Sequence, residues 1–418
     1  MPSSRPVSSS LLLLVLAAAS ASAGVLNVPG DHSSVTGALA AAGPGDSVLV
    51  DPGIYSSAAT GETFPLSVSP GVSLLGSGMA VSVVDADSAG SVVVMTGGRV
   101  NGFTLTRGAA PDGGGVHVLA GSPEIDGNLI VANWARDRGA GIHVAAGASP
   151  WIHHNVVWES KDTSLEQPGD PHGVQLADAD AVVEHNLIGR TESNGLFFNG
   201  TSNPEIRNNI FFENGIPGLR GRGICALADT TATIVHNLFF ANEIAAILVS
   251  TAEGVVDQTA EEANDLDAGD GVYGNLDGDP RFTDADAMDW SLLSVSPAID
   301  AGDPASPPDP DATPADIGPF HFDQAASGVP GGPPVPGLRA FPNPFTASIT
   351  IHPGAPSELS VVDVRGRLVR GLGRAVSPEI PVRWDGRDGN GRPAASGVYF
   401  LVSRTAAGSN ALPVLKLR

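Results

Sequence analysis

The sequence predicts an all-β protein: a right-handed parallel β-helix followed by a small antiparallel β-sandwich. Three observations lead to this prediction. A short strand pattern returns five times between residues 123 and 249, and each copy is followed by a second strand that opens on a small residue. A run rich in proline and glycine then separates these repeats from further short strands. Repeats of about 20–50 residues that consist of short strands are typical of solenoids.

The repeated pattern is a β-branched residue, two variable residues, an asparagine and two apolar residues. The asparagines are 27, 31, 23 and 28 residues apart, so we expect one coil for about every 27 residues and nine or ten coils in all. Stacked coils lie about 4.8 Å apart, so equivalent residues should form columns. We expect the asparagine to take the left-handed bend after the strand and to pass hydrogen bonds to the next coil. These structural asparagines are Asn128, Asn155, Asn186, Asn209 and Asn237.

Alternation in the second strand predicts which of its side chains point away from the core. The apolar residues of each strand should point inward, as Val116 and Val118 do in the first copy. The residues between them then form an outward column of His117, His143, Gln175, Phe197 and Cys225. A merely exposed strand face is one interpretation of this column, and a binding face is the other.

The N-terminal residues 1–23 have the features of a secretory signal peptide. Arg5 supplies a positive charge, an apolar run covers 11–19, and small residues end at Ala23. The run is too short to span a membrane, and no later stretch is long enough. We therefore expect a protein that is secreted or held on the outer cell surface after cleavage of the signal peptide.

The domain that follows, residues 24–322, should be capped at both ends. Val35, Ala38, Leu39 and Ala42 share one face of a short helix with a serine before it, and this helix would cover the first coil. Near the other end, residues 257–316 hold sixteen Asp or Glu against one basic residue, Arg281. This acidic cap is either a solvated surface or a Ca²⁺ site, for which the weak candidates are Asp265, Asp267 and Asp270.

Composition limits the partners. Apolar residues make up 42% of the chain and charged residues 16%, as in a globular protein. The net charge of −23 argues against binding to nucleic acid, because the phosphates would be repelled. The single cysteine, Cys225, excludes an internal disulfide framework, and its place in a strand predicts an inert thiol.

A proline- and glycine-rich linker at 323–337 leads to the last domain, residues 338–418. Strand-sized runs alternate there with turn signals, at 348–351, 359–364, 382–384 and 398–402. About 80 residues with this pattern predict a small antiparallel β-sandwich.

Particular phrases of the sequence resemble known families. The segments 45–55, 71–76 and 97–106 resemble the opening of secreted β-helix proteins of the pectate-lyase-like superfamily. The segments 279–282, 296–304 and 315–318 resemble the closing part of bacterial cell-surface β-helix proteins. The phrases at 341–345, 363–367, 384–388 and 395–400 resemble both the immunoglobulin-like domain of flagellar hook-assembly proteins and the C-terminal sorting domain of type IX secretion. The latter resemblance implies an export machinery as a partner, with the last domain as its sorting or anchoring tag.

Residues from the column and from neighbouring loops are candidates for substrate binding. Aromatic rings stack on sugar rings, and arginine or histidine can bond hydroxyl or carboxylate groups, so a groove for an extended glycan is one interpretation and plain solvation is the other. The longest joining loop, 159–172, would help to wall this groove. The candidates are His117, His143, Gln175, Trp134, Arg138 and Arg222.

Catalytic residues of the superfamily cannot be transferred to this chain. A lyase of this kind would need calcium-binding carboxylates beside an Arg or Lys base, and a glycosidase needs carboxylates at a fixed separation. The outward column contains no carboxylate. Weak candidates remain in the loops and at strand ends: Asp162, Asp170, His172, Asp178 and Arg220.

Three hypotheses for function follow. The first is a non-catalytic surface protein that binds a polysaccharide or a cell-envelope glycan. The second is a polysaccharide lyase or glycoside hydrolase that uses the same groove. The third is a structural adhesin or scaffold, which would need no groove at all.

Overall fold

A computed structural model describes residues 23–162, 171–218, 220–227, 232–251, 254–265, 271–324, 338–341, 343, 345–353, 356–363, 367–375, 380–405 and 408–416. The signal peptide predicted at 1–23 lies outside these residues except for Ala23, and so does the linker from residue 325 onward. None of the helices in the described part of the chain has the length and apolar character needed to cross a membrane.

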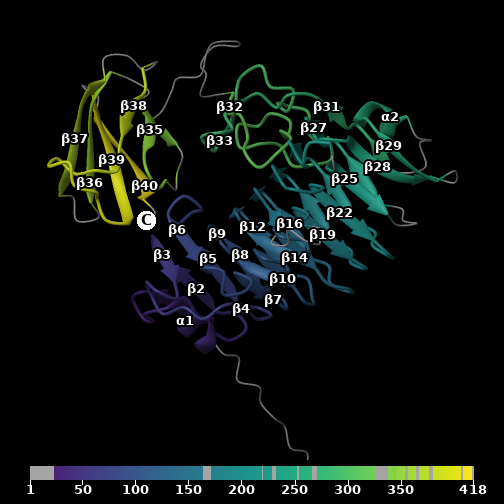
Figure 1. The fold of residues 1–418 in the computed structure, drawn as a ribbon, viewed down its shortest axis with the longest axis horizontal. Helices are drawn as coiled ribbons and strands as arrows, with labels where there is room; N and C mark the ends of the chain where they lie inside the picture. Colours follow the sequence, from purple (N-terminus) through teal and green to yellow (C-terminus); the bar gives the residue numbers. More distant parts are fainter. Residues whose placement is uncertain are drawn as a thin grey trace, which may run out of the picture.

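Three long sheets run side by side along a solenoid, as the sequence predicts (Figure 1). Sheet A contains β1 (Val25–Val28), β2 (Ser47–Val50), β5 (Ser73–Gly76), β8 (Arg99–Asn101), β12 (Glu124–Asp126), β16 (Trp151–His153), β20 (Val182–Glu184), β23 (Glu205–Arg207), β26 (Thr233–Val235) and β30 (Val272–Tyr273). Sheet B contains β3 (Gly53–Ser56), β6 (Ser82–Asp85), β9 (Thr104–Thr106), β13 (Leu129–Val131), β17 (Val156–Trp158), β21 (Leu187–Gly189), β24 (Ile210–Phe212), β27 (Leu238–Phe240) and β31 (Leu276–Asp277).

Sheet C completes each coil. It contains β4 (Leu66–Val68), β7 (Val93–Met95), β11 (Val116–Val118), β15 (Ile142–Val144), β19 (Val174–Ala177), β22 (Leu196–Asn199), β25 (Arg222–Leu227), β28 (Ala245–Thr251) and β29 (Gly254–Gln258). All of these pairings are parallel except the last, in which β29 runs antiparallel to β28 and ends the sheet. The fold class predicted from the repeats is therefore confirmed, and the β-helix agrees with the period of the asparagines.

The corner between sheets A and B explains the recurring asparagine. The residue before it takes a left-handed conformation in successive coils, for example His154 (φ 53°) and His185 (φ 50°). The asparagine itself is the next residue, so the prediction that it would take the left-handed bend is wrong. Its task is to bond between coils: the side chain of Asn155 donates to the Ile125 carbonyl (2.7 Å), and its Oδ1 accepts from the Asn128 backbone N–H (3.1 Å).

This ladder extends further than the five predicted asparagines. Asn237 donates its backbone N–H to Oδ1 of Asn275 (3.0 Å) in the last coil. Helix α2 (Ala260–Asn264) then presents Asn264, whose Oδ1 accepts from the Asn275 backbone N–H (3.0 Å). At the other end Phe103 takes the asparagine position, and its backbone N–H donates to Oδ1 of Asn128 (3.0 Å).

A second ladder lies at the corner between sheets B and C, five residues further along each coil. Asn214 donates its side chain to the Ile188 carbonyl (3.0 Å) and to Oδ1 of Asn242 (2.9 Å). Asn133 bonds in the same way to the Leu105 carbonyl (3.0 Å), and Thr191 takes the position in another coil. Sequence reasoning missed this ladder, although a polar residue five positions after each of the five predicted asparagines was its visible signal.

Both ends of the solenoid are covered. At the first coil, α1 (Val35–Ala41) begins at Ser34, whose Oγ accepts from the Gly37 backbone N–H (3.1 Å), and buries Val35 and Ala38. At the last coil, α2 packs against β28, β30 and β31. These helices shield the open ends of the core from solvent.

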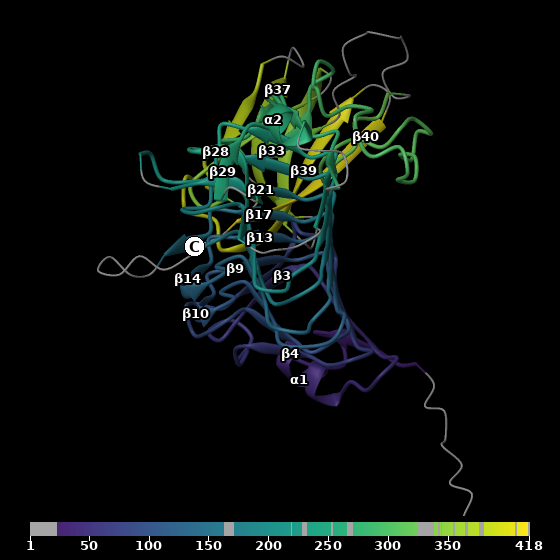
Figure 2. The ribbon, with the colours of Figure 1, turned by 90° about the vertical axis from the view of Figure 1, so that its right-hand side faces the viewer.

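The segment from 279 to 324 packs on the outer face of sheet B between β13 and β27 (Figure 2). Its strands β32 (Phe282–Asp284) and β33 (Asp289–Leu292) form a hairpin, and Trp290 packs edge-on against Trp158 with ring centroids 5.3 Å apart. This part of sheet B is consequently apolar on both faces. Gln324 also belongs to this segment, because its side chain donates to the Asp300 carboxylate (2.8 Å).

The C-terminal region forms two antiparallel sheets. One contains β34 (Arg339–Phe341), β35 (Ile349–His352) and β38 (Val382–Trp384). The other contains β36 (Ser357–Asp363), β37 (Leu368–Ala375), β39 (Gly397–Thr405) and β40 (Gly408–Lys416). Trp384, Phe345 and Leu401 fill the space between them. Phe400 also packs with Ile54 and Val83 of the first coils.

Candidate functional site

The predicted outward column on sheet C is in register from coil to coil. His117 pairs with His143, His143 with Gln175, Gln175 with Phe197, and Phe197 with Cys225. The flanking apolar residues point into the core, as predicted. However, the column is not an exposed face: His143 is 1% exposed, Gln175 is 3% exposed, and Cys225 is buried.

A small additional sheet explains why these side chains are buried. Strands β10 (Ala109–Asp112), β14 (Trp134–Arg138) and β18 (Lys161–Asp162) pair in parallel at the edge of the solenoid (Figure 2). The chain returns from β10 and β14 through Gly113 (φ 61°) and Gly139 (φ 54°). A Cβ atom on these glycines would lie 2.7 Å from Cβ of His117 and 3.0 Å from Cβ of His143, so the backbone passes directly against both histidines.

Further along the column, His172 stacks on Phe197 with ring centroids 4.6 Å apart. It is almost completely buried, and burial lowers its pKa to about 3. The imidazole is therefore neutral at physiological pH. Nδ1 of His172 contacts the Asn194 amide (3.5 Å), which fits a packing role better than the catalytic role considered from the sequence.

Several polar atoms in this buried region have no hydrogen-bond partner among the residues that the structure describes. They are Nδ1 and Nε2 of His143, Nε2 of His172, Oε1 of Gln175 and Oγ of Ser160. A buried polar atom without a partner is unfavourable by about 1–3 kcal/mol, so this cluster calls for an explanation.

The charged residues predicted to line a groove beside the column are instead paired in separate places. Arg138 holds Asp112 through two hydrogen bonds of 2.8 Å, and Arg222 holds Asp257. Trp134 is half-buried in β14.

The weak catalytic candidates are not assembled into one site in the described structure. Asp178 accepts from the Thr201 backbone N–H (2.9 Å) and so fixes a turn. Arg220 donates to the Glu192 carbonyl (3.0 Å). Asp170 lies outside the described residues, and Asp162 is described only through its place in β18.

The predicted calcium site is likewise only partly visible. Asp265 is an exposed residue at the C-terminal end of α2. Asp267 and Asp270 lie outside the described residues, so calcium binding there stays a prediction.

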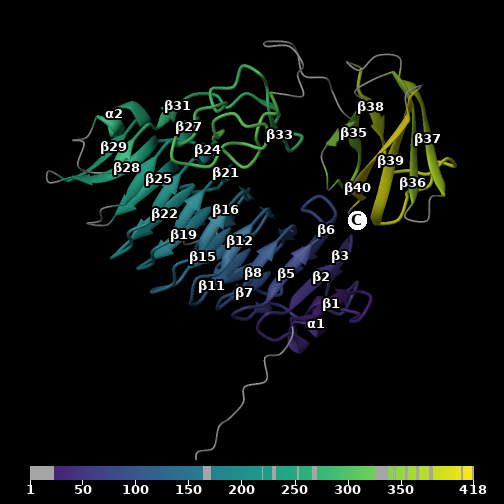
Figure 3. The ribbon, with the colours of Figure 1, turned by 180° about the vertical axis from the view of Figure 1, so that it is seen from behind.

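Sheet A presents a different face, which sequence reasoning did not identify as a site (Figure 3). The central residue of each strand points into the core, as Ile125 and Ile152 do. The two flanking residues point outward, so the face consists of two aligned columns. Its middle part contains Arg99, Glu124, Asp126, Trp151, His153, Glu184, Glu205 and Arg207.

Trp151 is an exposed aromatic side chain in the middle of this face, with 44% of its surface exposed. Its indole stacks on His153 (3.9 Å between centroids) and donates Nε1–H to the Glu184 carboxylate (2.7 Å). These two contacts fix the orientation of the ring while one side of it remains accessible. The sequence signal was present, because Trp151 and His153 alternate around the inward Ile152.

Ion pairs flank the tryptophan on both sides. Arg99 donates to both carboxylate oxygens of Asp126 (2.8 and 2.6 Å), and His153 contacts Glu124 (3.3 Å). On the other side Arg207 donates to Glu184 (2.6 Å). Burial alone would raise the pKa of Glu184, but the hydrogen bonds from Arg207 and Trp151 hold it below its ordinary value, so the carboxylate stays ionised.

The histidines at the corner beside this face stack on one another. The rings of His154 and His185 lie 5.0 Å apart and 9° from parallel. Burial, followed by the neighbouring His185, lowers the pKa of His154 to about 4.

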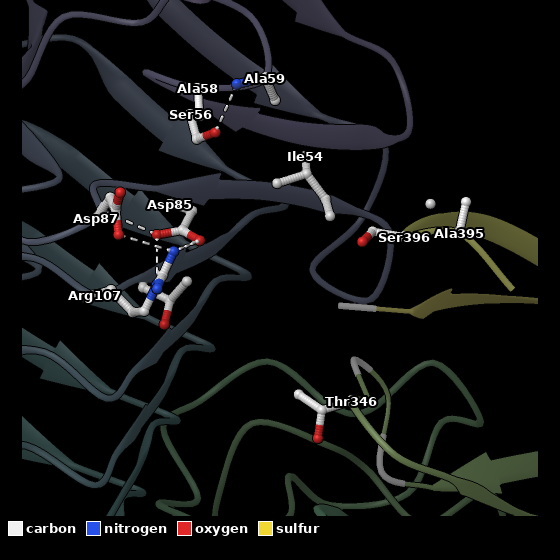
Figure 4. Close-up of a pocket in the computed structure, with 12 residues that line it drawn as sticks. Ile54, Ser56, Ala58, Ala59, Asp85, Asp87, Arg107, Thr346, Ala395 and Ser396 are labelled. Atoms are coloured by element: carbon white, nitrogen blue, oxygen red, sulfur yellow. Dashed lines mark hydrogen bonds and ion pairs between the residues drawn. The ribbon is translucent and has the colours of Figure 1, made fainter. Parts of the chain in front are cut away.

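One cavity, of about 720 Å³, lies between the first coils and the C-terminal sandwich (Figure 4). Its solenoid wall carries Asp85 and Asp87, both paired with Arg107, and its other wall carries Thr346 and Ser396. None of the binding or catalytic residues predicted from the sequence lines this cavity.

A comparison with protein families agrees with the fold. The family model described as a right handed beta helix region matches residues 91–259. The solved structure of pectate lyase Pel9A is 14% identical, with a TM-score of 0.40, over 72% of this chain and 97% of that one. A structure of PorZ, a surface component of the type IX secretion system of Porphyromonas gingivalis, is 28% identical over 20% of this chain, with a TM-score of 0.17.

The match to PorZ spans only 12% of that protein's length. No curated protein matches the sequence. The family match and the parallel pairing of sheets A, B and C together identify residues 91–259 as a right-handed parallel β-helix.

Proposed function

We propose that this chain is an exported, cell-surface protein that binds an extended glycan across the outer face of sheet A. The observation that supports the proposal most directly is Trp151, an exposed indole held in a fixed orientation between His153 and Glu184. An aromatic ring of this kind is a platform for a sugar ring, and polar groups beside it can bond the hydroxyls.

The outer faces of the three sheets differ in how far they are covered, and this difference favours sheet A as the binding face. The outer face of sheet B from β13 to β27 is covered by the segment that carries Trp290, and the middle of the sheet C column is buried. Sheet A extends over successive coils that each contribute outward polar side chains. From β1 to β30 its strands span about 43 Å at about 4.8 Å per strand spacing, a length that suits a polymer better than a small molecule.

Charge favours a neutral polymer. Between β8 and β23 this face carries four carboxylates, Glu124, Asp126, Glu184 and Glu205, but only two arginines. The whole chain has a net charge of −23, so a uronate-rich polymer would be repelled. The ion pairs leave carboxylate and guanidinium groups with further hydrogen-bonding capacity for hydroxyl groups.

Export and display would be the task of the C-terminal domain. Its two antiparallel sheets and the phrases at 341–345, 384–388 and 395–400 support a sorting or anchoring role with an export machinery as partner. The enzyme alternative, a lyase or hydrolase, gains less support from the described residues. Asp178 fixes a turn, Arg220 donates to a backbone carbonyl, and the ring of His172 packs on Phe197.

Binding to a panel of polysaccharides tests the proposal. The mature chain is run through native gels that contain neutral or uronate-rich polymers, and new reducing ends and unsaturated products are measured in parallel. We expect retardation by a neutral polymer without cleavage, and at least a tenfold weaker interaction for Trp151→Ala, since an exposed aromatic anchor contributes about 2 kcal/mol.

Leu227→Ala is the matched control, because Leu227 is similarly exposed but lies on sheet C. Equal binding by Trp151→Ala and the unmodified chain would refute the role of sheet A. The appearance of cleavage products would instead favour the enzyme alternative.

A further inference from the structure

The buried His143 and the partly buried His117 and Asp112 form a group with the composition of a metal site. Asp112 ends β10, and His117 and His143 lie in register on β11 and β15. One donor atom from each of the three residues lies within 4.8 Å of the other two. The two imidazole rings have their centroids 4.9 Å apart and are tilted by 60°.

An independent observation shows that this group is incomplete as it stands. His143 is 1% exposed, yet neither of its ring nitrogens has a hydrogen-bond partner among the described residues. A neutral imidazole carries one donor and one acceptor, so burial leaves two groups unsatisfied. A bound cation would remove part of this penalty by taking the lone pair of one nitrogen.

The donor set selects the kind of ion. Two imidazoles and one carboxylate suit Zn²⁺ and similar transition-metal ions, whereas Ca²⁺ prefers a shell of oxygen ligands. Zinc bonds to such ligands measure about 2.0–2.2 Å, so ligand atoms in a tetrahedral site lie about 3.4 Å apart. Donor atoms already within 4.8 Å can reach this separation by small side-chain rotations.

The surroundings fit a ligand set that is held in place. Arg138 donates two hydrogen bonds of 2.8 Å to Asp112 and so fixes the position of its carboxylate. Gln175 follows His143 in the column, and its Oε1 also has no partner in the described structure.

We propose that Asp112, His117 and His143 bind one divalent transition-metal ion of the zinc type, which ties β10 to the β11 and β15 strands of the solenoid. The site lies on a different face from the proposed glycan-binding surface. Its test therefore succeeds or fails independently of that function.

The experiment uses the mature chain without a polyhistidine tag, stripped with a chelator and then dialysed. Zn²⁺ is titrated by calorimetry, and Co²⁺ is added in a parallel sample to record its visible absorption spectrum, which reports four-coordinate nitrogen and oxygen ligation. We expect one equivalent per chain and a melting temperature that rises with Zn²⁺. Ca²⁺ should compete poorly.

Two variants and a matched control locate the ion. His117→Gln and Asp112→Asn each remove one ligand at a residue that is only partly buried. Each should weaken Zn²⁺ binding on the order of 100-fold or more. The control is His153→Gln. His153 is a buried histidine that forms the other cluster of possible metal ligands, with Glu124 and Asp126 on sheet A, and its replacement should leave the Zn²⁺ affinity unchanged. Absence of binding, or loss of binding in His153→Gln with retention in His117→Gln, would overturn the proposal.

Discussion

Replacement of Asn186 by alanine tests the idea that the asparagine ladder stabilises the solenoid. Asn186 is fully buried, and its Oδ1 accepts from the backbone N–H (2.9 Å) and the side-chain amide (3.1 Å) of Asn155. Its own amide donates to the carbonyls of Ile152 and Glu184, both at 2.9 Å, and to Oδ1 of Asn209 at 3.0 Å. A single substitution thus affects three consecutive coils.

The size of the loss follows from the groups left without partners. The Asn155 backbone N–H loses its acceptor, and two buried carbonyls lose a donor. An orphaned buried group costs about 1–3 kcal/mol, and carbonyls fall at the lower end because they keep a second lone pair. We therefore expect Asn186→Ala to lower the free energy of unfolding by roughly 3–5 kcal/mol, including a small cavity.

Urea denaturation followed by circular dichroism measures this change. Asn203→Ala, at an exposed asparagine of the same solenoid, is the control and should change stability by less than about 0.5 kcal/mol. A double-mutant cycle with Asn155→Ala should show coupling of about 0.5–3 kcal/mol. A loss below 1 kcal/mol for Asn186→Ala would refute the claim that the ladder bonds hold the coils together.

Three further predictions concern other parts of the chain. Burial lowers the pKa of His172 to about 3, below its unfolded value of about 6.5, so stability is lost as pH falls below 6.5. The free energy of unfolding in urea should therefore be lower at pH 5 than at pH 7, and His172→Phe should reduce this difference by about 2 kcal/mol. Exposed His321→Gln is its control. Trp290→Ala should cost about 3–5 kcal/mol and expose the segment over sheet B to proteolysis, which Val295→Ala, at an exposed residue, should not do. Ser34→Ala should cost about 1 kcal/mol in thermal unfolding by removing the cap of α1.

The fold could be predicted because each coil repeats the same local solution. Alternation around Ile152 or Val116 fixes the inward residues, and the spacing of asparagines fixes the length of a coil. Neither signal depends on distant parts of the chain. The same rule, applied to the first strand of each repeat, would also have placed Trp151 on an outward face.

The candidate site was less predictable, because exposure depends on segments that pack from far away. His143 alternates as an outward residue, but it is buried, and the backbone at Gly139 passes directly against it. Phe212 also points outward from sheet B, yet it is buried by the segment 279–324. Nearby, Arg190 pairs with Asp286, 96 residues further along the chain. Local periodicity contains no information about these contacts.

The asparagine ladder has a direction, which bears on how proteins of this shape change in size. Each asparagine presents its amide and backbone N–H to the next, and Phe103 and Asn264 close the two ends. Removal of residues 187–209 would bring Asn186 opposite Asn237 with the same donors and acceptors facing each other. Whole coils in the interior can therefore be duplicated or lost without a change at either end of the ladder. Evolution can thus adjust the length of the solenoid in steps of one coil, while the hydrogen bonds at both ends of the ladder are kept.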